Sequence, residues 1–148
     1  MQNAIHQPQS ILVLGGASDI GRAIVQALDS PTLRRVILAC RNPVGVDTSG
    51  LSDHAEVVAV EFDATDHAVH EGFIESLAMT YGDLDIVVQA FGQLGADDGD
   101  DPEKAARLAE VNYVGAVSSG LAVARQLRTQ GHGTLVVLSS VAGVRTRP

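Results

Sequence analysis

The sequence predicts an α/β protein with a parallel sheet covered by helices on both faces, and three observations support this fold class. Apolar runs of strand length alternate along the chain with segments of helical periodicity. These runs are rich in Val, Ile and Leu at consecutive positions, as strands buried on both faces are. The chain has 148 residues, 45% hydrophobic and 19% charged, which is enough for a core of its own. We therefore expect one domain, or one piece of a larger one.

The expected elements follow one another in a βαβ series. Apolar side chains with helical spacing run from Ile20 to Leu28, and Pro31 soon follows to end the first helix. The broken segment 41–55 predicts a loop with no more than one helical turn. The acidic segment 95–104 predicts a capping loop, with Pro102 as a natural first helical residue. Strands are expected at Ile11–Leu14, Arg35–Ala39, Val57–Phe62, Leu84–Ala90 and Thr134–Ser139, and helices at Asp19–Asp29, about Ala68–Tyr81 and Glu103–Arg128.

Charge and composition exclude several classes of function. A net charge of −8 argues against a nucleic-acid surface, and no apolar stretch approaches the roughly 20 residues of a membrane span. The single Cys40 excludes an internal disulfide and suits a reducing, cytoplasmic compartment. His67 and His70 lie three residues apart with no third ligand nearby, so we expect no metal site. Residues 1–10 are expected to form a flexible leader.

A glycine-rich turn follows the first predicted strand, in the stretch LGGASDIGRAI. A missing Cβ lets a turn reverse sharply, lets the backbone approach a ligand, and lets a helix pack tightly on a strand. The following helix N-terminus offers free N–H groups and partial positive charge, which favour a pyrophosphate. We therefore predict a phosphate-binding turn. Its residues are Gly15, Gly16, Ser18, Asp19, Ile20 and Gly21.

The spacing of this turn resembles the Gly-x-x-x-Gly-x-Gly turn of the short-chain dehydrogenase/reductase family, with Asp19 in place of the middle glycine. A carboxylate near a pyrophosphate is unfavourable unless it turns away, as it can at a helix cap or in the first turn. The resemblance implies a Rossmann-type, doubly wound parallel sheet with strand order 3-2-1-4-5. It further implies an NAD(P)-binding domain over residues 11–148, truncated after strand five and incomplete at its C-terminus.

Three later segments match this family in order. Arg41, and no acid, ends the second strand, which favours the 2′-phosphate of NADP over NAD, the alternative being an ordinary surface cation. The stretch FDATD resembles a family segment in which Asp63 would receive the adenine amino group and Ala64 would lie beside it. That stretch is also compatible with a plain helix-capping turn. The family's Asn-Asn-Ala-Gly segment, which lines the coenzyme ribose, is matched by Gln89 followed by Ala90, Phe91 and Gly92.

Catalytic residues are also implied by the resemblance, in part. EVNYVGA is similar to the helix segment whose Asn takes part in a proton relay, here Asn112, although this Asn could equally brace the helix. LVVLSSVAG resembles the segment with the catalytic Ser, placed on Ser140 with Ser139 as the alternate. Neither Tyr81 nor Tyr113 is followed four residues later by Lys, the pair that supplies the proton in the family. We expect the chain alone to be unable to complete hydride transfer.

Several stretches, among them VVQAFGQLG and ARQLRTQGHGTLVVLSS, are similar to family members that reduce a lipid-linked 2-keto pentofuranose with NADPH for cell-wall arabinan synthesis. This similarity implies a flavin-dependent oxidase partner that supplies the keto sugar. It also implies peripheral contact with the inner face of the cell membrane. The alternatives are a short-chain reductase of another carbonyl substrate and a noncatalytic dinucleotide-binding module. An uncovered fifth strand predicts self-association, and a homo-oligomer is expected.

Overall fold

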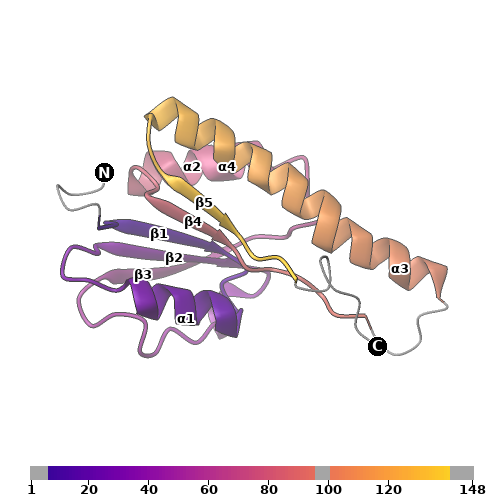
Figure 1. Ribbon diagram of the computed structural model, residues 1–148, viewed down its shortest axis with the longest axis horizontal. Helices are drawn as coiled ribbons and strands as arrows, with labels where there is room; N and C mark the ends of the chain where they lie inside the picture. The colour runs from indigo at the N-terminus through magenta and orange to yellow at the C-terminus, as the bar shows by residue number, and fades with distance from the viewer. Residues whose placement is uncertain (1–6, 96–100, 141–148) are drawn as a thin grey trace.

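The computed structural model describes residues 7–95 and 101–140. Five strands form one parallel sheet in the order β3-β2-β1-β4-β5 (Figure 1). The α/β fold and the strand order expected from the sequence are confirmed. The strands are β1 (Ser10–Leu14), β2 (Arg35–Cys40), β3 (Glu56–Glu61), β4 (Ile86–Gln89) and β5 (Thr134–Val137). The helices are α1 (Asp19–Leu28), α2 (His70–Tyr81), α3 (Pro102–Ala109) and α4 (Ala116–Gln130), with a 3-10 helix η1 (Pro43–Gly45) and a π-helical turn η2 (Glu110–Gly115).

The sheet separates two hydrophobic cores. Helix α1 covers one face of the sheet, and α2 and α4 cover the other (Figure 1). In β1, Leu12 and Leu14 join the core on the α2 and α4 side, whereas Ile11 and Val13 join the core on the α1 side. Successive side chains of a strand point to opposite faces, so a strand with both faces covered must be apolar at every position. This explains why the strands are continuous apolar runs.

Several element boundaries differ by one or two residues from those expected, and the start of β4 and the division of the long helical segment have clear structural causes. Strand β4 begins at Ile86, two residues later than expected, because the Gln130 side chain forms hydrogen bonds with both polar groups of the Leu84 backbone. Gln130 Oε1 accepts from Leu84 N at 3.2 Å, and Gln130 Nε2 donates to Leu84 O at 2.7 Å. The long helical segment is divided into α3, η2 and α4, and it begins at Pro102 as expected. Asp101 caps it by accepting hydrogen bonds from the first-turn amides.

The described structure is already packed against the sheet before Ile11, at residues 8–10. Pro8 is buried, and Gln9 N donates to Asp85 Oδ2 at 2.8 Å. Ser10 already belongs to β1, and its Oγ donates to the Asp83 carbonyl oxygen at 2.6 Å. Residues 1–6 of the predicted leader lie outside the described residues.

The loop after β2 contains the single short turn expected, η1, and it is tied to α1. The Arg22 guanidinium donates to the carbonyl oxygens of Asp47 and Ser49 at 2.6 and 3.0 Å, and pairs with the Asp47 carboxylate at 2.8 Å. Hydrogen bonds from Ser49, and then Arg22, lower the pKa of Asp47 to about 2. Gln26 Nε2 adds a bond to Gly50 O at 3.1 Å. These contacts fix the loop whose first residue is Arg41.

Strand β5 forms one edge of the sheet and pairs only with β4 among the described strands. Its residues are exposed or half-buried. None of the described helices combines the length and apolar character that crossing a membrane requires. Within the described ranges, no group of three or more His, Cys, Asp or Glu side chains could hold a metal ion.

Candidate functional site

The turn after β1 is held by the strands beside it. The amides of Gly15 and Gly16 both donate to the Ala39 carbonyl oxygen of β2, at 2.8 and 2.9 Å. Gly15 has φ +97°, and a Cβ there would lie 2.5 Å from the backbone N of Phe91. Any larger residue would be strained by its own backbone conformation and would collide with the chain that follows β4.

The other two glycines of the turn also make room for protein atoms. A Cβ on Gly16 would lie 2.6 Å from Leu38 Cβ in β2, and one on Gly21 would lie 2.9 Å from Val13 Cγ1 in β1. Tight packing of helix on strand, which the sequence predicted, is therefore what Gly21 provides. A Cβ at any of the three glycines would meet atoms of a neighbouring strand or of the segment after β4, so the space beside these glycines is filled by the protein itself.

The N-terminus of α1 is the part of the turn that can bind an anion. Ser18 is the N-cap, and its Oγ accepts from the Gly21 amide at 3.2 Å. The amides of Asp19 and Ile20, both exposed residues, have no hydrogen-bond partner in the described part of the chain. Such unpaired first-turn N–H groups, aided by the helix dipole, favour a phosphate. Asp19 lies in the first turn, one of the positions expected for it.

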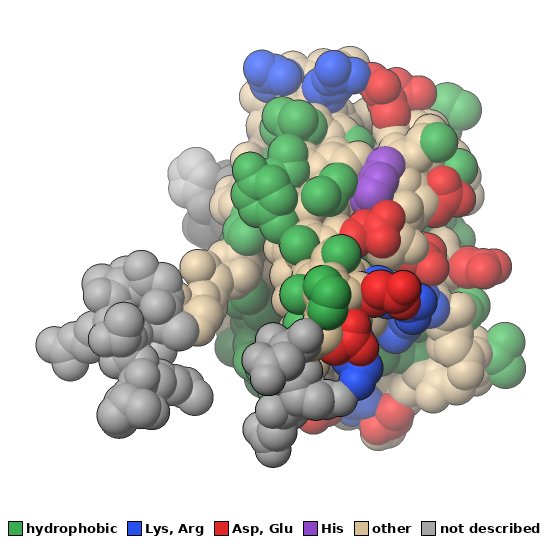
Figure 2. Space-filling view, turned by 90° about the vertical axis from the view of Figure 1, so that its right-hand side faces the viewer, with side chains coloured by type: hydrophobic (Ala, Val, Ile, Leu, Met, Phe, Trp, Pro, Cys, Tyr) green, Lys and Arg blue, Asp and Glu red, His purple; other side chains and the backbone are tan. Residues whose placement is uncertain are grey.

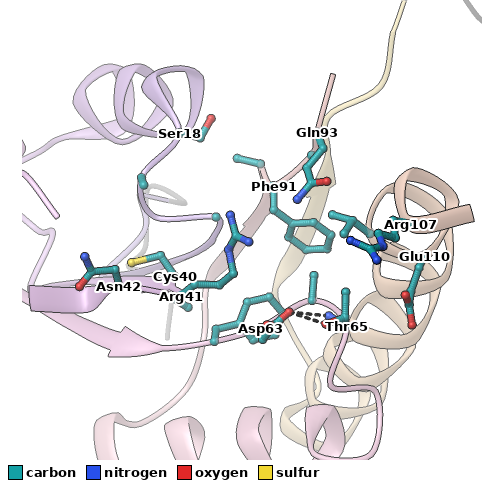
Figure 3. A pocket seen from close by; sticks show the side chains of 18 residues that line it. Ser18, Cys40, Arg41, Asn42, Asp63, Thr65, Phe91, Gln93, Arg107 and Glu110 are labelled. Carbon is teal, nitrogen blue, oxygen red and sulfur yellow. Dashed lines mark hydrogen bonds between the residues drawn. The ribbon is translucent and has the colours of Figure 1, made fainter. Parts of the chain in front are cut away.

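A cleft of about 810 Å³ opens over the carboxyl ends of β1 to β4 (Figure 3). Eight of the predicted binding residues line it, whereas Gly16, Asp19, Ile20 and Gly21 do not. The turn and the ends of β2 and β3 contribute Gly15, Ser18, Arg41, Asp63 and Ala64, and the end of β4 contributes Ala90, Phe91 and Gly92. The structure therefore brings together residues from four separate strand ends.

The far wall of the cleft was not predicted. It consists of Arg107 in α3 and of Glu110 and Val111 in η2 (Figure 3). Val111 immediately precedes Asn112, and Arg107 lies four residues before Val111, on the same side of the helix. Helical spacing counted back from Asn112 could therefore have indicated that Arg107 and Val111 face the cleft. Cys40 also lines the cleft at the end of β2, where a buried small residue was expected.

Opposite charges face this cleft from the ends of β2 and β3. Asp63 Oδ1 accepts hydrogen bonds from Thr65 N at 2.9 Å and Thr65 Oγ1 at 2.8 Å. These bonds lower the pKa of Asp63, and the positive charge of Arg41 lowers it further, so the carboxylate is ionised at neutral pH. Arg41 is exposed and makes no ion pair or side-chain hydrogen bond within the described residues. Its guanidinium is free to meet an anion.

The two predicted catalytic side chains lie outside the cleft lining. Asn112, in η2, accepts from Gln93 N at 2.8 Å and donates to Gln93 O at 2.8 Å. Both polar atoms of its amide thus brace the segment after β4 against the helix. Ser139 and Ser140 follow β5 as exposed residues, and neither lines the cleft. The catalytic roles expected for Asn112 and Ser140 therefore stay predictions.

A protein-family model described as short chain dehydrogenase matches residues 9–148. The chain belongs to the short-chain dehydrogenase family. An uncharacterized oxidoreductase of Streptomyces coelicolor is 42% identical over 99% of this chain and 60% of its own length. An uncharacterized oxidoreductase of Mycobacterium tuberculosis is 36% identical over 93% of this chain and 57% of its own. The chain thus spans about 60% of the length of these short-chain dehydrogenase relatives.

Among solved short-chain dehydrogenase structures, an NAD⁺-bound xylitol dehydrogenase matches with a TM-score of 0.78 at 27% identity. The match covers 95% of this chain and 56% of that one. Coenzymes of the NAD(P) type are typical of this family. The comparison supports the fold and does not distinguish NAD from NADP.

One departure from the short-chain dehydrogenase pattern has a structural explanation. Gln89 stands where the family segment has its first Asn. Its Nε2 donates to Ala116 O at 3.0 Å and to Ser119 Oγ at 2.8 Å, and the side chain is 4% exposed. Gln89 therefore ties β4 to α4 and does not enter the cleft.

Proposed function

We propose that this chain binds NADPH and orients it for the reduction of a carbonyl group, as part of a short-chain reductase. The observation that carries the proposal is the unpaired guanidinium of Arg41 at the end of β2, inside a cleft that no acid from that strand end lines. An acid at this place would hold the ribose hydroxyls of NAD, whereas a cation accommodates the 2′-phosphate of NADP.

The rest of the cleft supports the same orientation of the coenzyme. The pyrophosphate would lie against the first-turn amides of Asp19 and Ile20, beside the cleft. The ionised carboxylate of Asp63 would accept the adenine amino group, with Ala64 beside it. The coenzyme supplies the hydride when bound. The predicted role of Ser140 is to hydrogen-bond the substrate oxygen as negative charge develops on it.

Fluorescence titration of the chain with NADPH and NADH tests this proposal. We expect NADPH to bind more tightly, and Arg41→Gln to weaken NADPH binding by about 10- to 100-fold, since a hydrogen bond to a charged group is lost. NADH binding should hardly change in this variant. Arg34→Gln is the matched control, because Arg34 is exposed, precedes β2, and does not line the cleft. Equal affinities for NADPH and NADH would contradict the role of Arg41.

Cys40 offers a second readout for the same experiment. It is the only cysteine of the chain, is 7% exposed, and lines the cleft beside Arg41. Bound NADPH should slow alkylation of this thiol, and NADPH should protect it less in the Arg41→Gln variant. Unchanged labelling at saturating NADPH would place the coenzyme elsewhere.

For the substrate we propose a keto sugar, with decaprenylphosphoryl-2-keto-erythro-pentofuranose as the specific candidate. Sequence stretches similar to those of decaprenylphosphoryl-2-keto-ribose reductases support it. The xylitol dehydrogenase, named for a five-carbon polyol, supports the sugar class only. In this proposal a flavin-dependent oxidase supplies the keto sugar, and the lipid tail brings the protein to the inner membrane face.

The alternatives are another carbonyl substrate and a noncatalytic dinucleotide-binding module. The gene sequence beyond the codon of Pro148 distinguishes an enzyme from a module. A continuation with Tyr and, four residues later, Lys supports a reductase, because this pair supplies the proton and binds the nicotinamide ribose in the family. A stop codon there supports the module.

We also propose that the chain self-associates. Exposed apolar side chains lie along η2 and α4, with Val117 46% and Leu121 57% exposed, and Val137 of the edge strand is 54% exposed. Figure 2 shows hydrophobic side chains gathered on one face of the molecule. Sedimentation should reveal a mass that rises with concentration and falls in Leu121→Glu. Val44→Glu, in an exposed loop, is the control. A monomer at all concentrations would argue against this assembly.

A further inference from the structure

The ring of Phe91 lies in the middle of the cleft, between Arg41 and Arg107 in the view of Figure 3. It is half-buried, and its centre is 5.8 Å from that of Phe62, with the two planes 47° apart. Phe62 packs in turn against Phe73 at 5.3 Å. Phe91 is therefore the outermost ring of an aromatic row that begins in the core, and its free side belongs to the cleft.

The backbone of Phe91 is held on several sides. Ala90 N donates to Leu14 O at 2.8 Å, and the bare Cα of Gly15 packs against the Phe91 peptide. Gln93, two residues after Phe91, forms hydrogen bonds with the Asn112 side chain through both its backbone N and its backbone O. The backbone that carries the ring is thus held in place without a ligand, which reduces the ordering cost of binding.

The groups around the ring fit a flat, amino-substituted base. Asp63 presents an ionised carboxylate that accepts hydrogen bonds. Arg41 and Arg107 present guanidinium donors, and neither forms an ion pair within the described residues. Adenine has an exocyclic amino donor, ring nitrogen acceptors, and a π face that stacks on aromatic side chains. These neighbours come from the ends of β2 and β3 and from α3.

We infer that the Phe91 ring is the stacking surface for the adenine of the coenzyme, with Arg107 as a donor at the outer edge of the base. The inference rests on the proposed function, because it takes NADPH as the ligand. It assigns a role to Phe91, which stands where the family segment has Ala. It also assigns a role to Arg107, on a wall of the cleft that the family motifs do not include.

Calorimetric titrations with ADP and with nicotinamide mononucleotide test the inference, because only ADP carries the base in question. Phe91→Leu, which keeps bulk and removes the π face, should weaken ADP binding by about 5- to 150-fold, the range of base–aromatic stacking. Phe91→Tyr should retain ADP affinity, and nicotinamide mononucleotide should bind all three proteins alike. Phe73→Leu is the matched control, since Phe73 belongs to the same aromatic row and does not line the cleft.

The outcomes separate the two proposals. If the wild-type chain binds NADPH, and Phe91→Leu binds ADP as tightly as or more tightly than wild type, the inference is overturned and the ring instead obstructs the base. A weakened affinity for nicotinamide mononucleotide alone would place the other end of the coenzyme on Phe91, and would overturn the inference too. Failure of the wild-type chain to bind NADPH at all would overturn the proposed function itself.

Discussion

Replacing Gly15 by alanine is expected to lower the free energy of unfolding by about 2–6 kcal/mol. Backbone strain at a positive φ costs about 1–3 kcal/mol, and overpacking costs about as much again. Here φ is +97°, and the new methyl group would lie 2.5 Å from the Phe91 amide nitrogen. The loss is a large share of the roughly 5–15 kcal/mol by which domains are stable. Urea unfolding followed by circular dichroism measures it.

Gly72→Ala is the matched control for this substitution. Gly72 lies in α2, a Cβ there meets nothing within 4 Å, and its φ is not positive. Alanine should stabilise the helix at this position by about 0.5–1 kcal/mol. If Gly15→Ala unfolds at the same urea concentration as wild type, the turn does not have the described conformation.

Replacing Gly115 by alanine is expected to destabilise the fold by about 1–3 kcal/mol through overpacking, despite the better helix propensity of alanine. A Cβ at Gly115 would overlap the carbonyl oxygen of Ala64, which belongs to the backbone and cannot rotate away. The helix must then retreat from the loop after β3, which lines the cleft. NADPH affinity should fall together with stability, and both are measurable on the same variant.

Gly120→Ala in the same helix system is the comparison for Gly115. A Cβ there would lie 3.4 Å from the end of the Gln89 side chain, an ordinary contact. We expect little change in stability or NADPH binding. Equal behaviour of the two variants would mean that η2 does not pack closely on the Ala64 backbone.

The fold was predictable because its signals are local and repeated. Apolar runs such as that of β2 are buried along nearly their whole length, and the alternation with amphipathic helices leaves few topologies. The boundaries were less predictable where side chains compete for backbone groups. The Gln130 side chain binds the Leu84 backbone, so β4 begins later than expected, and nothing in the local sequence of Leu84 indicates this contact.

The candidate site was predictable along the strand ends and unpredictable across the cleft. Arg41 and Asp63 directly follow apolar strands, so their positions at one edge of a parallel sheet can be inferred. Arg107 reaches the same cleft from a helix more than 40 residues later than Asp63. Its place depends on how the helix lies over the sheet, which is set by close contacts such as that between Gly115 and Ala64. Packing of this kind leaves no motif in the sequence.

The double hydrogen bond of Asn112 has a mechanical consequence. Because both polar atoms of its side chain bond the Gln93 peptide, Asn112 ties the segment after β4 to the middle of the long helix. Tyr113, the next residue along that helix, is 69% exposed, and Gln93 lines the cleft. We therefore expect a ligand that displaces Gln93 to change the emission of Tyr113, measured in a variant in which Tyr81 is replaced by Phe.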